Sequence, residues 1–151
     1  MKELLVDDIL NEPVSYTTSK WIIERIPHIF NNDLENYIDW KERLSTLIGV
    51  DSKAIVFTGS SAVGFSLNPK KNFKVFQNDS DIDVAIISSH YFDIAWHFLR
   101  NIGPKYHRLK PAVQNAITEH RERFIYYGTI ATDRIVHILP FGKEWVNAMN
   151  E

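Results

Sequence analysis

The stretch from Ile55 to Ile87 constrains the fold of this chain more than any other part of the sequence. It begins with an apolar run that ends abruptly at Gly59-Ser60, and it closes with a second apolar run around Asp81 and Asp83. Successive side chains of a strand point to opposite faces, so these two aspartates would share one face. Their Cα atoms would lie roughly 6.7 Å apart along the strand. The pattern therefore predicts two carboxylates that lean toward one point.

Placing two carboxylates together is unfavourable unless a cation joins them. At a separation of roughly 5 Å and an effective dielectric constant of about 20, they repel by about 3 kcal/mol. Divalent metal ions would reverse the sign of that interaction. Asp81 and Asp83 are therefore candidate metal ligands and catalytic residues. The alternative is a surface strand end with two solvated aspartates.

The segment before the aspartates favours a phosphate ligand. A strand over Ala54–Phe57 stops at Gly59, and an amphipathic turn of helix follows it. Backbone N–H groups at such a helix start bind anions. Gly59 permits the tight turn without a Cβ clash, Ser60 adds a hydroxyl donor, and Ser61 is a secondary contact. A phosphate site followed by a two-carboxylate metal site is the minimum needed to move a nucleotidyl group.

These residues carry a resemblance to a known family. The runs Val56-Phe57-Thr58-Gly59-Ser60-Ser61 and Ser80-Asp81-Ile82-Asp83-Val84 resemble the signature of the DNA polymerase beta-like nucleotidyltransferase superfamily. The spacer of 20 residues between Ser60 and Asp81 is similar to that of the oligoadenylate and cyclic-dinucleotide synthase branch. The short chain is similar to the minimal nucleotidyltransferases. The resemblance implies a metal-dependent enzyme that transfers a nucleoside monophosphate from a nucleoside triphosphate, ATP, to a hydroxyl acceptor, with Mg²⁺ or Mn²⁺ on Asp81 and Asp83.

The expected fold is α+β, with a mixed β-sheet nucleotidyltransferase core flanked by helices. One nucleotidyltransferase-like domain would cover residues 1–151, with a helical part over 1–50 and a sheet core carrying the site over 54–141. Apolar periodicity and caps predict helices near 1–10, 17–29, 33–49, 90–103 and 109–123, and one beginning at 145. Strands are expected over 54–57 and 81–88, and as a hairpin over 123–130 and 134–141. Asp33 is the expected N-cap of the third helix, and Trp21 and Trp40 are interpreted as core residues rather than a base-stacking surface. In the fourth helix one apolar face is expected to be buried, and His97 is interpreted as structural; the face consists of Phe92, Ala95, Leu99 and Ile102.

One position departs from the family pattern. The superfamily carries a third carboxylate on a later strand, and here the matching stretch is Val136-His137-Ile138-Leu139-Pro140. His137 would stand in that place as a metal ligand or general base, with Mn²⁺ favoured over Mg²⁺. Alternatively, the metal site is incomplete and the protein binds without turnover, or His137 is an ordinary core histidine. Asp133 as the carboxylate is disfavoured, because four strand residues span roughly 13 Å.

Composition sets the class of protein. The chain has 151 residues, of which 44% are hydrophobic and 24% charged, as in an ordinary globular domain. It has no cysteine, which excludes disulfides and cysteine-based zinc sites. The acidic start lacks a signal peptide, and no apolar run approaches the length of about 18 residues typical of a membrane span. We therefore expect a cytoplasmic protein without a membrane partner.

The charge is unevenly distributed. Residues 1–51 hold 5 Lys or Arg against 10 Asp or Glu, whereas residues 52–151 hold 12 against 9. Six basic residues fall between Arg100 and Arg123, a pattern suited to triphosphate or RNA. Lys110, at the start of a predicted helix, is a candidate nucleotide contact. A solvated helix face is the alternative.

The resemblance also bears on partners. The synthases have a large helical domain after the catalytic core, and this chain ends soon after Trp145. We therefore expect a helical partner protein, or a second copy in a homo-oligomer, to supply the other half of the cleft. RNA or tRNA is one possible acceptor. The alternative function is a catalytically lapsed nucleotidyltransferase fold that acts as a nucleotide-binding or antitoxin-like regulatory partner.

Overall fold

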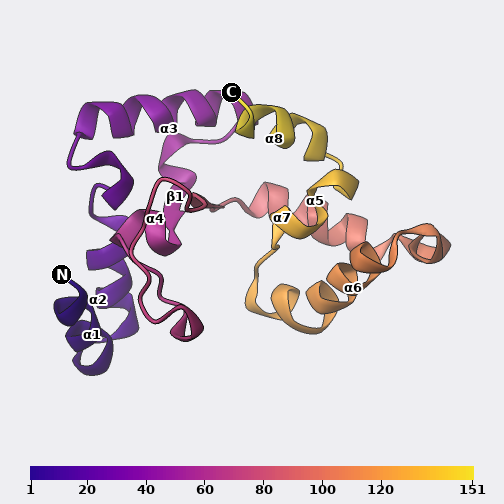
Figure 1. Ribbon diagram of the computed structural model, residues 1–151. Helices are drawn as coiled ribbons and strands as arrows, with labels where there is room; N and C mark the ends of the chain where they lie inside the picture. Colours follow the sequence, from indigo (N-terminus) through magenta and orange to yellow (C-terminus); the bar gives the residue numbers. More distant parts are fainter. The chain divides into compact units, whose positions relative to one another are not determined.

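The chain divides into two compact units in the computed structural model, which describes residues 1–151 apart from the side chain of Pro69. Unit 1 comprises Met1–Thr46 and Val50–Ile87, and unit 2 comprises Leu47–Gly49 and Ser88–Glu151. Figure 1 shows the elements of each unit. The sequence-based expectation of one domain over residues 1–151 did not include this division.

The amino-terminal part of unit 1 is helical, as predicted. It contains α1 (Lys2–Asn11), α2 (Val14–Thr18) with a π-helical continuation over Ser19–Ile23, a 3₁₀ turn over His28–Phe30, and α3 (Leu34–Ile48). The carboxylate of Asp33 accepts a hydrogen bond of 3.0 Å from the backbone N–H of Asn36, so the predicted cap of the third helix is confirmed. Gly49, at φ +68°, follows the last turn of this helix.

A single antiparallel pair of strands forms the sheet in the described part of the chain. β1 (Ile55–Thr58) pairs with β2 (Asp83–Ile86), and α4 (Gly59–Val63) follows β1 directly (Figure 1). The register sets Ile55 opposite Ile86 and Thr58 opposite Asp83. The α+β class is therefore correct at the level of helices with a small sheet. The predicted mixed sheet is wrong, because the described residues hold no further strand pair.

Aromatic side chains fill the core of unit 1. Phe57 of β1 is fully buried, and its ring centroid lies 5.2 Å from that of Phe30, 5.9 Å from Tyr37 and 4.7 Å from Trp40. Trp21 belongs to the same cluster and is 6% exposed. The sequence interpretation of Trp21 and Trp40 as core residues rather than a base-stacking surface is confirmed.

Unit 2 is helical throughout its described residues. Its elements are α5 (Ser89–Arg100), a 3₁₀ helix over Gly103–Arg108, α6 (Pro111–Glu119), a π-helical stretch over His120–Phe124, a 3₁₀ turn over Ile125–Tyr127, α7 (Thr132–Ile135), a 3₁₀ turn over Val136–Ile138, and α8 (Gly142–Met149). The Ser88 hydroxyl caps α5 by accepting from the N–H of Tyr91. The hairpin predicted over 123–130 and 134–141 is wrong, because both segments consist of short helical turns and connections.

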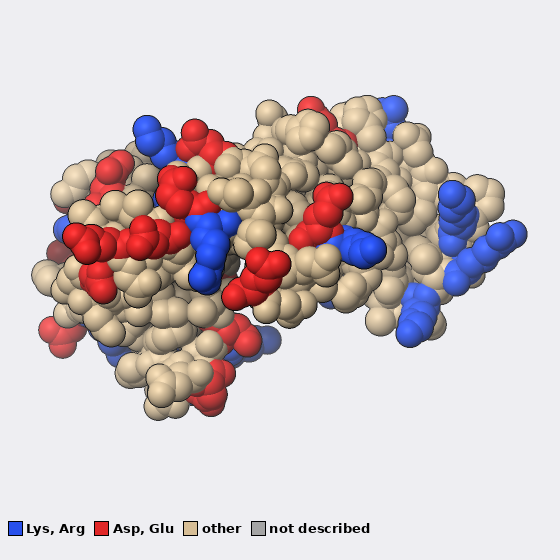
Figure 2. Space-filling model, turned by 90° about the horizontal axis from the view of Figure 1, so that it is seen from above, with Lys and Arg blue, Asp and Glu red and all other residues tan. Residues whose placement is uncertain are grey.

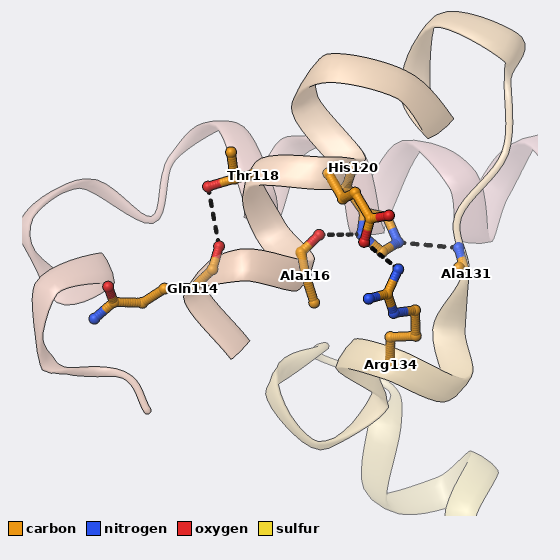
Figure 3. A network of polar contacts seen from close by, with 7 residues as sticks. Gln114, Ala116, Thr118, His120, Ala131 and Arg134 are labelled. Carbon is orange, nitrogen blue, oxygen red and sulfur yellow. Dashed lines mark hydrogen bonds and ion pairs between the residues drawn. The ribbon is translucent and has the colours of Figure 1, made fainter. Parts of the chain in front are cut away.

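A buried histidine gives the physical reason for this error. His120 is fully buried, its Nδ1–H donates to the carbonyl of Ala116 at 2.6 Å, and its Nε2 accepts from the N–H of Ala131 at 3.0 Å (Figure 3). An extended strand over the eight residues before Ala131 would measure roughly 27 Å. One imidazole ring could not reach the far end of such a strand, so the chain must turn back on itself.

None of the helices in the described residues combines the length and apolar character that a bilayer crossing requires.

Candidate functional site

The two halves of the sequence motif meet at one end of the small sheet. Asp83 is the first residue of β2 and pairs with Thr58, the last residue of β1, while Gly59 follows immediately. A Cβ built on Gly59 would overlap Oδ2 of Asp83, and it would lie 3.3 Å from Cγ of the same side chain. The Asp83 carboxylate therefore lies directly over Gly59, although 83 and 59 are far apart in sequence.

Two separate constraints act on Gly59. Its φ of +61° lies in the left-handed region, which favours glycine over residues with a Cβ. The Asp83 carboxylate also occupies the space that a side chain would need. The residue thus permits both the turn between β1 and α4 and the approach of a carboxylate to that turn.

The two serines of this turn differ in their environment. Ser61 is fully buried, and its hydroxyl donates to the carbonyl of Thr58 at 2.9 Å. Ser61 therefore fixes the turn through this bond, and its hydroxyl faces no ligand. Ser60 is half-buried, and its hydroxyl has no protein partner among the described residues. Of the two hydroxyls, that of Ser60 is free to contact a phosphate.

Asp81 and Asp83 are both exposed, and neither takes part in an ion pair within the described residues. The predicted strand over 81–88 begins only at Asp83, so the expectation that strand alternation aligns Asp81 with Asp83 is not met. No group of three His, Asp or Glu side chains gathers to hold a metal in the part of the chain that the structure describes. Two carboxylates are nevertheless enough for Mg²⁺ when substrate phosphates and water complete its shell.

The other candidate residues lie in unit 2. His137 is exposed on the 3₁₀ turn over Val136–Ile138, so its placement on a strand was wrong. Asp133 is exposed in α7, and Lys110 is exposed at the residue that precedes α6. Unit 1 by itself therefore holds Gly59, Ser60, Ser61 and the two aspartates of the predicted set.

A polar network in unit 1 escaped the sequence analysis. The carboxylate of Asp8 accepts from the indole N–H of Trp21 at 2.6 Å and from the ammonium of Lys20 at 2.7 Å. The hydrogen bond from Lys20 lowers the pKa of Asp8 below its usual value, and the bond from Trp21 acts in the same direction. The same hydrogen bond raises the pKa of Lys20. No spacing signal marks this network, because α1 and the π-helical stretch bring its members together only in the folded chain.

Comparison with known proteins adds no relative to this description: no family model, curated protein or solved structure matches the chain. The functional assignment therefore depends on the residues and geometry described above.

Proposed function

We propose that this chain is a metal-dependent nucleotidyltransferase that moves a nucleoside monophosphate from a nucleoside triphosphate, ATP in the first instance, to a hydroxyl acceptor. The single observation that supports this most is the Asp83 carboxylate lying over Gly59 at the β1–α4 turn. The Asp83 carboxylate is exposed and has no ion-pair partner among the described residues, so it is available to a metal ion. A site that must hold both a metal ion and a phosphate uses that arrangement.

The residues present suit a magnesium or manganese ion. Asp81 and Asp83 offer hard carboxylate oxygens two residues apart in the sequence, and these are the ligands that Mg²⁺ prefers alongside substrate phosphates. When bound, the ion would neutralise charge on the triphosphate. The protein's own part is to hold the Asp83 carboxylate at the end of the sheet beside the Gly59 turn, so that an ion on this carboxylate would also meet a phosphate there.

The reaction joins the acceptor oxygen to the α-phosphorus and breaks the bond to the β-phosphate, with pyrophosphate as the leaving group and the acceptor's hydroxyl proton passing to a general base. The Ser60 hydroxyl and the backbone of Gly59 would contact the β- and γ-phosphates. His137 is proposed as the group that takes the third carboxylate's place, and Lys110 as a further phosphate contact. Both residues lie in unit 2, whereas the aspartate pair lies in unit 1. A helical partner protein or a second copy of the chain would complete the acceptor side, for which RNA or tRNA is one candidate.

The test is transfer of label from α-³²P nucleoside triphosphates, with Mg²⁺ and separately with Mn²⁺. We expect label in a product with the natural protein and a loss of at least about 100-fold with Asp81→Asn/Asp83→Asn, because the electrostatic term is the main source of rate in such sites. Asp79→Asn is the matched control, since Asp79 is a neighbouring exposed aspartate outside the motif. Equal transfer by the double variant would refute the assignment.

A second function has one observation in its favour. Within the described residues no third carboxylate joins Asp81 and Asp83, and residues 134–141 form no strand to carry one. A protein that binds nucleotide without turnover, acting as an antitoxin-like or regulatory partner, needs only the pair. Metal-dependent ATP binding that Asp83→Asn abolishes, with no transfer under either metal, would favour this function. Transfer activity gained by His137→Asp would show that the natural chain has lost its catalytic group.

A further inference from the structure

A strongly basic surface lies in unit 2, away from the aspartate pair in the sequence. The side chains of Arg100, Lys105, Arg108 and Lys110, which we call the basic edge, are all exposed. No Asp or Glu occurs anywhere between residues 94 and 118. None of the four basic side chains has an ion-pair partner among the described residues. In Figure 2, Lys and Arg side chains gather over the part of unit 2 where Figure 1 places the 3₁₀ helix over Gly103–Arg108, with no acidic side chain among them.

The backbone that carries the basic edge is held in place by polar contacts. The hydroxyl of Tyr106 lies 3.0 Å from Oγ1 of Thr118 on α6, and the side-chain amide of Gln114 donates to the carbonyl of Leu109 at 2.8 Å. The guanidinium of Arg121 lies 5.5 Å from the centre of the Tyr106 ring and donates to the carbonyl of Leu99. These contacts tie the 3₁₀ helix to α5 and α6. The charges are therefore presented on a fixed segment, which lowers the entropy lost on binding.

A groove of about 520 Å³ runs along α5 and shares Lys105 with the basic edge. Ile94, Phe98 and Pro140 give it an apolar wall. Cations without an ion-pair partner among the described residues thus lie beside a partly apolar recess, with Lys105 common to both.

The polar lining of the groove offers both donors and acceptors. Asp93, His97 and Asn101 follow one another at intervals of four residues along α5, which places them on one face of the helix. His97 is exposed, so its side chain is available to a ligand rather than committed to the core. Side-chain amides and carboxylates of this kind hydrogen-bond the edges of nucleobases.

We propose that the basic edge and this groove bind single-stranded nucleic acid, with backbone phosphates on Lys105, Arg108 and Lys110 and one unstacked base in the groove. Sequence readers of RNA take single strands because an unpaired base can leave the stack and enter such a recess. The six-residue 3₁₀ helix measures roughly 12 Å, long enough for a few successive phosphates. The proposal concerns unit 2 alone and does not depend on nucleotidyl transfer.

Two other partners fit the surface less well. An anionic membrane is contacted by exposed apolar side chains beside the basic ones, and the large exposed hydrophobic residues of unit 2 are Tyr126, Tyr127 and Met149, none of them on the basic edge. An acidic peptide would bring carboxylates toward Asp93 in the groove, and the like charges would repel. A nucleobase, by contrast, can donate an amino group to Asp93 while its phosphates face the cations.

The experiment is fluorescence anisotropy of the full chain with labelled oligo(U) and oligo(dT) of about 12 nucleotides, a length within single-strand site sizes. With three phosphates neutralised, the logarithm of affinity should fall with the logarithm of salt with a slope of about −2. Lys105→Gln/Arg108→Gln should weaken binding by about tenfold or more and flatten the slope by about 1.4. Arg123→Gln/Lys143→Gln, which removes two exposed charges elsewhere in unit 2, should change affinity by less than about twofold.

A further variant tests the groove. Asn101→Ala should weaken binding while leaving the salt slope unchanged, because it removes a base contact rather than a phosphate contact. A preference for oligo(U) or for oligo(dT) would assign the strand as RNA or DNA, and either supports the proposal. Equal losses in the two charge-removal variants, tighter binding to a duplex of the same length, equal affinity for anionic phosphatidylserine vesicles, or the absence of saturable binding would overturn it. An unchanged affinity in Asn101→Ala would overturn the placement of a base in the groove.

Discussion

At the scale of single residues, Gly59 is the position where backbone conformation and proposed chemistry meet. Alanine at Gly59 would keep the left-handed φ of +61° and would press its Cβ against the Asp83 carboxylate. Since the overlapping atom is the end of a side chain, the carboxylate would swing aside, and the unfolding free energy would fall by only about 1–2 kcal/mol, the cost of the backbone conformation. We expect nucleotidyl transfer, or metal-dependent ATP binding, to fall by at least about tenfold, the effect of misplacing a group by about 1 Å.

Gly128 supplies the matched control for that substitution. Its φ is +68°, and a Cβ there would meet nothing within 4 Å. Gly128→Ala should therefore lower the free energy of unfolding, measured by urea denaturation, by a similar amount. It should leave nucleotidyl transfer unchanged. If the two variants lost transfer to the same extent, the proposed link between the glycine turn and the Asp83 carboxylate would be wrong.

The Asp8 network leads to a pH dependence of stability. The pKa of Asp8 is lowered in the folded chain, first by the hydrogen bond from Lys20 and then by that from Trp21. A carboxyl group with a lowered folded pKa stabilises the fold above its unfolded pKa of about 3.9, and that contribution is lost as the pH falls through the folded value. We expect Asp8→Asn to be less stable than the natural chain at pH 7. As the pH falls below 5, it should lose less stability than the natural chain, as measured by urea unfolding. Asp39→Asn, at an exposed site with no ion pair among the described residues, should follow the natural curve.

At the scale of elements, the helices were predictable because local signals agreed with the fold. Asp33 caps α3 as the sequence indicated, and Ala95, Leu99 and Ile102 are buried along the face that periodicity assigned to the helix at α5. The contact between Gly59 and Asp83 was harder to predict from the sequence. The motif predicted that both residues serve one site, but the spacer between them does not determine which residue of β1 pairs with which residue of β2. Only the observed register sets Thr58 opposite Asp83.

The segment 123–141 could not be predicted because strand and helix periods coincide in its apolar residues. Ile135, Leu139 and Phe141 are spaced by even numbers and would share one face of a strand, while 135 and 139 also share one face of a helix. Burial of Val136 and exposure of His137 distinguish the two, and that information exists only in the fold. The long-range bonds of His120 decide the outcome, since they act between residues that local patterns do not connect.

Removing the His120 ring should therefore destabilise unit 2. His120→Ala leaves the half-buried N–H of Ala131 without its partner and opens a cavity at a fully buried position, and together these effects should cost about 3–5 kcal/mol. Urea unfolding followed by tryptophan fluorescence measures the loss. His107→Ala, at an exposed histidine, should stay within about 0.5 kcal/mol of the natural chain. A loss below about 1 kcal/mol for His120→Ala would mean that the ring does not hold the Ala131 segment in place.

At the scale of the whole molecule, charge divides between the two units. Unit 1 carries 9 Lys or Arg against 13 Asp or Glu, and unit 2 carries 8 against 6. An acidic unit repels a nucleoside triphosphate unless metal ions neutralise the triphosphate. The basic edge, by contrast, attracts a chain of phosphates in the absence of metal ions. The sequence pointed to one site that drew on both halves. The structure assigns the aspartate pair to unit 1 and the basic edge to unit 2.

Asp83 on one side and the pair Lys105 and Arg108 on the other should therefore respond separately to substitution. We expect Asp83→Asn to abolish metal-dependent ATP binding while the dissociation constant for oligo(U) stays within about twofold, because the aspartate lies in unit 1. Lys105→Gln/Arg108→Gln should show the reverse pattern, with oligonucleotide affinity lowered and ATP affinity retained. Chelation of Mg²⁺ should reproduce the first pattern, since only ATP binding uses the carboxylates. Titrations of ATP and of labelled oligo(U) against each variant give all four constants. If Asp83→Asn weakened both ligands equally, one shared site would explain the data better than two, and the basic edge would then serve the triphosphate itself.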